Sequence, residues 1–317
     1  MSPHRPDPAR PVVVLGGNGF VGRHTCAAFA ATGAPVVAVS RRPARLPGAR
    51  SVALDLAAGD VPRLIGMLTA MRPFAVVNAA GAVWGVTEEE LKASNVTLVH
   101  NLVEAVTALP WRPRLVHLGS VHEYGAVGCP IREDAQPRPI SPYGHSKLAG
   151  AGAVLAAVGA GACDATVLRV VNVSGPGTPR ASLLGQVADQ LAAARRERRT
   201  ALLRLAPLHA RRDFVDVRDI AAAVRATALT PGAGPVINIG RGQAVSVRWL
   251  VRELITASGV PAEIVEHEDR ATGEERGRGI DSQEIDTTRA REQLGWQARH
   301  ALGESLAALW AHVRDRA

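Results

Sequence analysis

The feature that most constrains the fold is the segment VVVLGGNGFVG at residues 12–22, where a short apolar run leads into four glycines. The run fits a buried strand, and the residues that follow fit a helix over 20–33 that closes at Gly33. Glycines between a strand and a helix permit a tight turn and let the backbone approach a ligand closely. The segment therefore predicts a loop that holds the pyrophosphate of a dinucleotide against a helix N-terminus.

Strand and helix patterns alternate through the first half of the chain. Further apolar runs predict strands at 35–40, 51–56, 74–81, 114–120 and 165–175, and longer helices at about 88–108 and 141–158. Apolar strands joined by crossover helices form a parallel sheet that is covered on both faces. The sequence thus predicts an α/β protein, a Rossmann-type doubly wound parallel sheet with a smaller α/β C-terminal substrate region.

The chain of 317 residues has room for two such parts. We expect residues 1–10 to be a flexible lead-in and 11–175 to form the dinucleotide-binding Rossmann domain. Residues 176–317 are expected to be mainly substrate-binding, with 201–240 returning partly to the Rossmann sheet.

Composition limits the setting and the partners. The N-terminus has no apolar signal segment, no run is long enough to span a bilayer, and three scattered cysteines fit a reducing compartment. We therefore expect a cytoplasmic protein without a membrane partner. The net charge is +8, but the densest basic run, at 194–200, follows a helical pattern without interleaved aromatic residues. This favours small anionic ligands over nucleic acid.

The end of the second predicted strand indicates which dinucleotide binds. An acidic residue there would accept from a ribose hydroxyl, whereas cations would bind a 2′-phosphate. The chain has Ser40, Arg41 and Arg42 at this point and no acid. This favours NADP(H) over NAD(H), the alternative being a basic surface loop. Asp55, after the third strand, either accepts from the adenine amino group or is an ordinary loop aspartate.

Tyrosine and lysine each occur only twice in the chain, and one of each lies in SPYGHSK at 141–147. Tyr143 and Lys147 are four residues apart, so on a helix they lie on the same face. A free phenol has a pKa near ~10, and an adjacent ammonium favours the phenolate and lowers that pKa. The pair is therefore suited to general acid–base chemistry.

These segments, together with others, resemble the extended short-chain dehydrogenase/reductases, the NAD(P)-dependent nucleotide-sugar epimerase, dehydratase and reductase family. The resemblance covers essentially the whole chain. The matching segments are GGNGFVG (16–22), NAAG (78–81), SNVTLVHNLVEA (94–105), GSVHEYG (119–125), SPYGHSK (141–147), RVVNVSGPG (169–177), RRDFVDVRDIAAA (211–223), INIG (237–240) and ERGRGIDSQEIDTTRAREQLGW (275–296).

The resemblance implies roles for the central residues. Tyr143 would be the general acid/base, Lys147 would also bind the nicotinamide ribose, and Ser120 would hold the reacting oxygen. His122 stands where dehydrating relatives have an acid and where some epimerising relatives have a cysteine. It could donate a proton, hydrogen-bond the substrate or serve a structural role, and the missing acid disfavours dehydration and decarboxylation.

The resemblance also implies two sets of binding residues. The cofactor set is Gly16, Gly19, Phe20, Val21, Gly22, Ser40, Arg41, Arg42, Asp55, Leu56, Ala79, Ala80 and Lys147. The substrate set is His122, Asn172, Arg212, Arg276 and Arg278, with Arg212 and Arg276 clamping a pyrophosphate and Arg278 competing with Arg276. The helices at 88–108 and 141–158 resemble those that form the family's homodimer interface, and no metal is expected.

The segment GSVHEYG looks most like that of reductases of 4-keto-6-deoxyhexoses. The leading prediction is an NADPH-dependent 4-ketoreductase of a nucleotide-diphospho-4-keto-6-deoxyhexose, with thymidine the favoured base (dTDP). A nucleotide-sugar 4-epimerase with tightly bound NAD(P) is the alternative. A non-catalytic dinucleotide-binding sensor is a minor alternative that the intact Ser120, Tyr143 and Lys147 disfavour.

Overall fold

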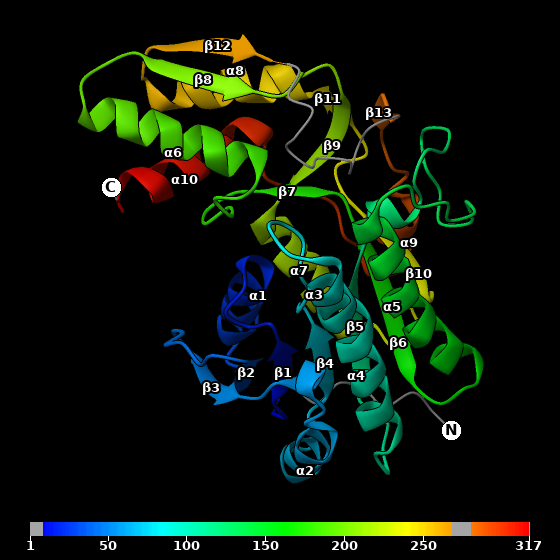
Figure 1. Cartoon of the computed structure of the whole chain (residues 1–317). Helices are drawn as coiled ribbons and strands as arrows, with labels where there is room; N and C mark the ends of the chain where they lie inside the picture. The colour runs from blue at the N-terminus through cyan, green and yellow to red at the C-terminus, as the bar shows by residue number, and fades with distance from the viewer. Residues whose placement is uncertain (1–8, 268–279, 317) are drawn as a thin grey trace.

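A seven-stranded sheet forms the centre of the larger part of the molecule (Figure 1). The computed structural model describes residues 9–267 and 280–316. Across the sheet the strands follow the order β10 (Val236–Ile239), β6 (Asp164–Val170), β5 (Arg114–Ser120), β4 (Ala75–Asn78), β1 (Val12–Leu15), β2 (Val36–Ser40) and β3 (Ala49–Ala53). Every neighbouring pair is parallel. The predicted Rossmann-type sheet is confirmed, with β10 added beside β6.

Helices cover both faces of this sheet, which explains why an inner strand such as β1 is apolar throughout. Val12 and Val14 of β1 belong to the core beneath α1 (Phe20–Ala30) and α7 (Val217–Leu229). Val13 and Leu15 point to the opposite face, where α2 (Val61–Met71), α4 (Leu98–Thr107) and α5 (Pro142–Gly159) pack. Successive side chains of a strand alternate between faces, so a strand buried on both sides needs an unbroken apolar run.

The long helix predicted at 88–108 is formed in three segments. Thr87 caps α3 (Glu88–Lys92) through a reciprocal pair of hydrogen bonds with Glu90. A π-helical turn, η2 (Ala93–Thr97), then leads into α4. Within this turn the buried Asn95 donates to the carbonyl of Ala82 and to Ser146 Oγ of α5, both at 3.0 Å. The turn thus joins the loop after β4 to the helix that carries Tyr143.

The smaller part of the molecule has its own hydrophobic core and two small sheets. A two-stranded parallel sheet, β8 (Ala201–Leu205) with β12 (Ala262–Glu266), packs with α6 (Leu183–Arg196), α8 (Val247–Ser258) and α10 (Leu302–Arg314). A second sheet has β9 (Arg211–Asp216) between β11 (Ala244–Ser246) and β13 (Ser282–Gln283), and β7 (Asn172–Ser174) also pairs with β9. The helix α9 (Thr288–Leu294) contacts β10 of the central sheet.

Two of the predicted strands differ from the structure in their bounds, and one predicted segment is divided between sheets. The run at 165–175 is divided at Val171 into β6 and β7, which belong to different sheets. The third strand is β3, which ends at Ala53 before Asp55 begins a short 3-10 helix, η1 (Leu56–Ala58). Within 201–240, β10 lies in the central sheet, whereas β8 and β9 lie in the smaller sheets. The proposed lead-in lies outside the described residues except for Ala9 and Arg10.

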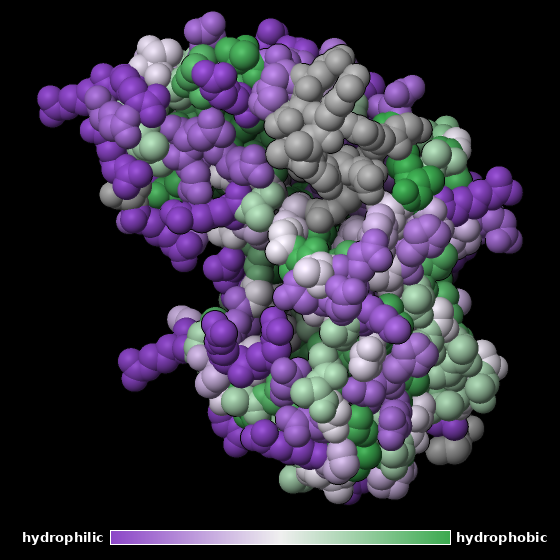
Figure 2. All heavy atoms as spheres, in the orientation of Figure 1, coloured by the Kyte–Doolittle hydropathy of each residue, from purple (hydrophilic) through white to green (hydrophobic). Residues whose placement is uncertain are grey.

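The two parts are joined at the first turns of α1. Arg23 Nη2 donates to the carbonyl of Gly177 at 2.8 Å, and His24 Nε2 lies 2.9 Å from the carbonyl of Pro176. A carbonyl oxygen only accepts, so His24 Nε2 carries the hydrogen. On the face drawn in Figure 2 the outline of the molecule narrows between the two parts. Of the helices described, none has the length and apolar character needed to cross a bilayer.

Candidate active site

The glycine loop lies at the carboxyl end of β1 and is packed too closely for side chains. A Cβ on Gly16 would approach the backbone of Ala79 and Ala80 at 2.6–2.7 Å, and one on Gly22 would lie 2.0 Å from the carbonyl oxygen of Gly16. Gly16 also has φ +73°, which favours glycine. The structure thus brings the glycine loop and the Ala79–Ala80 segment together. These are two of the predicted cofactor-contacting elements.

The N-terminus of α1 fits an anionic group. Gly19 caps the helix without a side-chain hydrogen bond, and no acidic residue lies in the first turn, which contains Phe20, Val21 and Gly22. A helix N-terminus carries a partial positive charge and N–H groups that bind phosphate. The chain therefore provides a cradle suited to a dinucleotide pyrophosphate.

The loop after β2 carries the arginines that were predicted to choose the dinucleotide. Arg41 and Arg42 are exposed, and Ser40 Oγ donates to the carbonyl of Arg42 at 2.9 Å. The Asn18 side chain of the glycine loop also donates to that carbonyl, and its Oδ1 is buried without a partner. Asn18 was not among the predicted residues, although its place inside the glycine loop was a signal. The structure thus ties the backbone of Arg42 to the glycine loop.

Asp55 and Leu56 have structural contacts in this conformation. Asp55 Oδ1 accepts from the backbone N–H groups of Ala57 and Ala58 at 3.2 and 3.3 Å and so caps η1. Leu56 is buried, and its carbonyl accepts from the side chain of Asn101 at 2.6 Å. Their contact with an adenine stays a prediction.

The predicted catalytic residues come together where β5 ends and α5 begins. Ser120 is the last residue of β5 and caps the 3-10 helix η3 (Val121–Glu123), its Oγ accepting from the backbone N–H of His122 at 3.2 Å. Tyr143 lies in the first turn of α5, with its ring edge-on to that of His122 at a centroid distance of 5.6 Å. Lys147 follows one turn later on the same helix.

Lys147 is held by the strand that bears Ser120. Its ammonium is buried and donates to the carbonyl of Leu118 at 2.6 Å. Burial lowers the pKa of this ammonium, and the Glu123 carboxylate opposes the effect. Burial and the charge of Lys147 together hold the pKa of His117 well below its usual range. His117 is therefore neutral, and Lys147 is the cation beside the phenol-bearing turn.

The predicted substrate residues Asn172 and Arg212 lie on the sheet around β9. Asn172 Nδ2 donates to the carbonyl of Asp213 at 3.2 Å. Arg212 is 8% exposed, and its Nη1 donates to its neighbour's carbonyl, that of Arg211, at 2.8 Å. Burial lowers the pKa of Arg212, with the charge of Asp281 opposing the effect. Arg276 and Arg278 lie outside the described residues.

Gln283 is a residue of this sheet that the sequence reasoning missed. It pairs with Arg212 in the parallel register of β13 and β9, so both side chains lie on the same face. Gln283 is 1% exposed, yet neither its amide oxygen nor its amide nitrogen has a hydrogen-bond partner within residues 9–267 and 280–316. Buried amides without partners are rare in native proteins. The only sequence signal was its position in the 275–296 segment.

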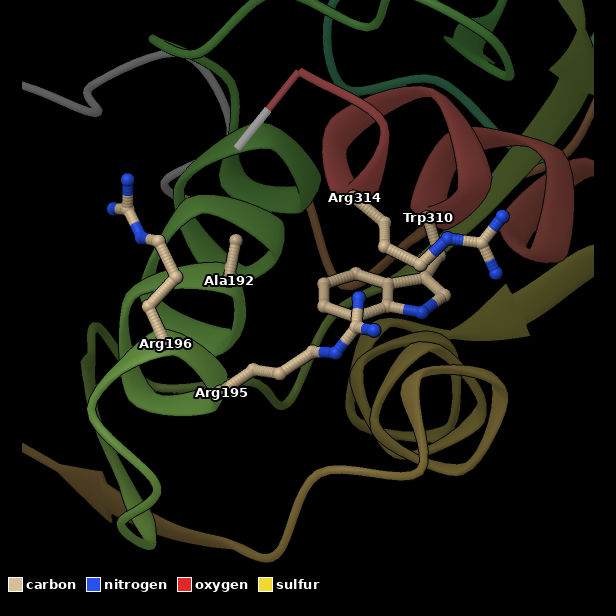
Figure 3. A pocket seen from close by; sticks show the side chains of 5 residues that line it. All are labelled: Ala192, Arg195, Arg196, Trp310 and Arg314. Carbon is tan, nitrogen blue, oxygen red and sulfur yellow. The ribbon is translucent and has the colours of Figure 1, made fainter.

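A hollow of about 320 Å³ lies elsewhere, between the C-terminal ends of α6 and α10. It is lined by Ala192, Arg195, Arg196, Trp310 and Arg314. Arg195 and Arg314 extend towards the indole of Trp310, whereas Arg196 points away (Figure 3). Arginines in the last turn of a helix are stabilised by the helix dipole. The hollow contains none of the predicted site residues.

Known proteins resemble the chain over almost its full length. It is 46% identical over 307 residues to a dTDP-6-deoxy-L-talose 4-dehydrogenase (NAD(P)(+)) of Kitasatospora kifunensis, covering 96% of this chain and 95% of the relative. It is 31% identical to a UDP-glucose 4-epimerase of Azospirillum brasilense, covering 91% of this chain and 87% of that one.

Two solved structures share the fold. RMD from Pseudomonas aeruginosa complexed with NADPH has a TM-score of 0.82 at 25% identity, covering 98% of this chain and 100% of the other. MoeE5 in complex with UDP-glucose and NAD has a TM-score of 0.81 at 30% identity, covering 96% and 99%.

The Rossmann-type sheet, the glycine loop and the Ser120, Tyr143 and Lys147 cluster define a dinucleotide-dependent oxidoreductase class. Residues 12–240 match the model of the NAD dependent epimerase/dehydratase family, and the chain belongs to that family. The predicted membership of the extended short-chain dehydrogenase/reductases is confirmed. The protein is accordingly an NAD(P)-dependent enzyme of the nucleotide-sugar 4-dehydrogenase, reductase and epimerase class.

Proposed function

We propose that the protein is an NADPH-dependent 4-ketoreductase of a dTDP-4-keto-6-deoxyhexose. The observation that carries the proposal is the joint occurrence of the Ser120–Tyr143–Lys147 cluster and 46% identity to a dTDP-6-deoxy-L-talose 4-dehydrogenase. That name describes oxidation at C4 of a deoxysugar, and an enzyme accelerates both directions of one reaction. Reduction of the 4-keto sugar is the reverse of that oxidation.

Ser120, Tyr143 and Lys147 would each have a distinct role in the reaction. The bound dinucleotide supplies or accepts a hydride. Ser120 would donate its hydroxyl hydrogen to the C4 oxygen, since its Oγ already accepts from the N–H of His122. Tyr143 would give the proton that the developing alkoxide requires. Lys147 would stabilise the resulting phenolate and exchange its bond with the Leu118 carbonyl for one with the nicotinamide ribose.

The preference for NADPH is part of the proposal. Arg41 and Arg42 are exposed beside the glycine loop, and the loop after β2 offers no acid for a ribose hydroxyl. A guanidinium binds phosphate oxygens with two parallel hydrogen bonds. The relative's name admits both NAD and NADP, so the arginines are the argument for this chain.

The test is a reduction assay with matched sugars. Enzyme, NADPH and a dTDP-4-keto-6-deoxyhexose are expected to give stoichiometric loss of NADPH absorbance and one 6-deoxyhexose product. With dTDP-6-deoxy-L-talose and NADP⁺ the absorbance is expected to rise. Matched UDP- and GDP-linked 4-keto sugars are the controls for the base. No change in absorbance with any of these sugars would refute the reductase.

The second candidate is a nucleotide-sugar 4-epimerase, favoured by the 31% identity to a UDP-glucose 4-epimerase. An epimerase oxidises and re-reduces the same carbon and therefore recycles its dinucleotide. Interconversion of C4 isomers without net loss of NADPH, by an enzyme that purifies with its dinucleotide bound, would select this function.

We further propose a homodimer that buries the outer faces of α4 and α5. Leu98, Val103 and Leu155 on these helices are only partly buried in the single chain. Light scattering is expected to give twice the chain mass. Substituting Val103→Glu is expected to give a monomer that still binds NADPH.

A further inference from the structure

Glu123 is a buried carboxylate that the proposed reaction does not use. It follows Ser120 by three residues at the end of η3, and its side chain is 0% exposed. Its Oε1 accepts from the backbone N–H of Ser120 at 2.7 Å. Ser120 in turn accepts from the N–H of His122. Both the backbone and the hydroxyl of Ser120 are thus fixed within one short turn.

The carboxylate occupies a space made for it in the sheet. A Cβ on Gly119 would lie 2.6 Å from Glu123 Oε1 and 2.8 Å from Val167 Cγ1. Gly119 has an extended position in β5, so the missing side chain, and not a positive φ, explains the glycine. Any larger residue would displace the carboxylate from the N–H of Ser120.

Arg169 holds the other oxygen of Glu123. Its Nε donates to Oε2 at 2.8 Å, and its side chain is 4% exposed. Arg169 lies opposite Gly119 on β5 and opposite Asn238 on β10. Its guanidinium stacks 4.3 Å from the ring centroid of Tyr124, and the Tyr124 hydroxyl donates to Asn238 Oδ1 at 2.8 Å. Three neighbouring strands therefore fix the position of the carboxylate.

The charge of Glu123 also acts on Lys147 of α5. On α5 and the elements packed against it, the buried ionisable groups are Arg114, His117, Glu123, Lys147 and Arg169, and His122 lies against Tyr143. His117 is neutral, and Arg114 is paired with Asp164 at the other end of β5. Among the described residues of these elements, Glu123 is therefore the buried anion beside Lys147 and Arg169. The other charged groups on α3 and α4 are exposed: Glu88, Glu89, Glu90, Lys92, His100 and Glu104. Exposed charges are screened by water and act weakly.

We propose that Glu123, clamped by Arg169, is a positioning residue that fixes the Ser120 turn and supplies the negative charge that offsets the Lys147 ammonium. Fixing Ser120 gives its hydroxyl one direction towards the reacting oxygen. Offsetting the ammonium raises the pKa of Lys147 and so opposes the effect of its burial. The inference rests on the proposed reaction only where turnover is measured.

The charge role can be tested without a sugar because the chain has only two tyrosines. Near-ultraviolet titration of the protein reports phenolate formation, and Tyr143→Phe identifies which transition belongs to Tyr143. Glu123→Gln preserves the shape and the acceptor for Ser120 but removes the charge. The field around the phenol becomes more positive, so Tyr143 is expected to titrate lower by on the order of one pH unit. Glu123→Asp keeps the charge and is expected to titrate as the native protein does.

The geometric role is tested by the same pair of variants under turnover. Aspartate is one methylene shorter and cannot hold both the N–H of Ser120 and Arg169. Glu123→Asp is therefore expected to lower kcat roughly ten- to hundredfold with little change in NADPH affinity, because small misplacements of reacting groups are costly. In Glu123→Gln the alkaline limb of the pH–rate profile is expected to move to lower pH with the phenol.

Several outcomes would overturn the inference. Native kcat in Glu123→Asp would remove the positioning role, and an unchanged Tyr143 titration in Glu123→Gln would remove the charge role. Breaking a buried ion pair costs about 3–5 kcal/mol, so a second variant covers the case in which Glu123→Gln does not fold. The double variant Glu123→Gln, Arg169→Gln then replaces it. Its charge changes cancel, so Tyr143 should titrate at the native pH, and a shift of a full unit would contradict the role. The titration is valid even if no sugar is turned over.

Discussion

The turn that bears Ser120 and the sheet face that bears Arg212 differ in whether their buried polar side chains have hydrogen-bond partners. Around Ser120, the side chains of Glu123, Lys147 and Arg169 have hydrogen-bond partners within the protein. On the β9 face, Gln283 is just as buried but has none among the described residues. The contrast teaches that the polar groups around Ser120 are fixed by contacts within the protein, whereas the β9 face keeps unused hydrogen-bonding capacity.

Two buried carboxylates, Glu123 and Asp213, differ in the groups that hydrogen-bond them. Glu123 is balanced by the guanidinium of Arg169 at 2.8 Å. Asp213 on β9 accepts from the backbone N–H groups of Arg241 and Gly242 at 3.1 and 2.8 Å. Burial nevertheless raises the pKa of Asp213 to about 7. The first carboxylate has a guanidinium hydrogen-bonded to it, whereas the second is held by backbone N–H groups, with the charge of Arg241 acting in addition.

The largest expected effect is at the ordered turn. Tyr143→Phe keeps the ring but removes the acid, and general acid catalysis is worth roughly 10²–10⁴-fold. Single-turnover reduction of the 4-keto sugar is expected to slow by that factor, while NADPH binding measured by calorimetry stays close to native. Near-native turnover would mean that the proton comes from elsewhere, and His122, edge-on to the same ring, would be the first residue to test.

The next effect concerns the exposed end of β2. In Arg41→Ala, Arg42→Ala two phosphate contacts are lost, each worth about 1.5–3 kcal/mol for a charged hydrogen bond. NADPH affinity is therefore expected to fall at least roughly tenfold. NADH affinity should hardly change, because NADH has no 2′-phosphate. Arg45→Ala, on the same loop, is the matched control. Calorimetry that finds NADH bound as tightly as NADPH by the native protein would refute the preference.

A smaller effect is expected on stability at Asp213. An unfolded aspartate has a pKa near ~4, so the folded state takes up an additional proton between about pH 4 and 7. Stability contributed by this group falls as pH rises through that window. Asparagine stays neutral across this pH window. The free energy of unfolding of Asp213→Asn should therefore decline by about 1–3 kcal/mol less than that of the native protein. Urea unfolding at both ends of the window measures this, and equal slopes for the two proteins would contradict it.

The smallest effect on folding is expected at Gln283. Methionine has a similar volume and no polar group to leave unpaired, so Gln283→Met should change the free energy of unfolding by less than about 1 kcal/mol. If the amide is reserved for the substrate, KM for the nucleotide sugar should rise several-fold while NADPH binding is unaffected. A large loss of stability with unchanged KM would show that the amide is a structural group after all.

The central sheet could be predicted because its signals are local. Apolar runs, the glycine loop and capped helices each depend on neighbouring residues. The prediction of a single strand over 165–175 was wrong because it also relied on local signals alone. The run is apolar on both sides of Val171, and only the pairing of β7 with β9 shows that the chain changes sheets there.

The site was predictable where a short motif carries the chemistry. Ser120, Tyr143 and Lys147 lie within 28 residues of one another and meet at the β5 and α5 ends. Glu123 and Gln283 could not be singled out from the sequence because their burial and contacts depend on residues far away in the chain. Arg169 is 46 residues from Glu123, and Gln283 lies beside Arg212 only through a strand pairing across 71 residues. Burial and unpaired amides have no signature in a single sequence.

The contacts of Arg23 and His24 with the 176–177 carbonyls have a mechanical consequence. These two residues directly follow the glycine loop, and the two carbonyls lie where the smaller part of the molecule begins. The corner between the two parts is thereby pinned on the side of α1. The bridge between Ile131 and Ile285 ties the β13 side to the larger part as well, so the two parts are held together on both sides of their junction and not at one corner alone.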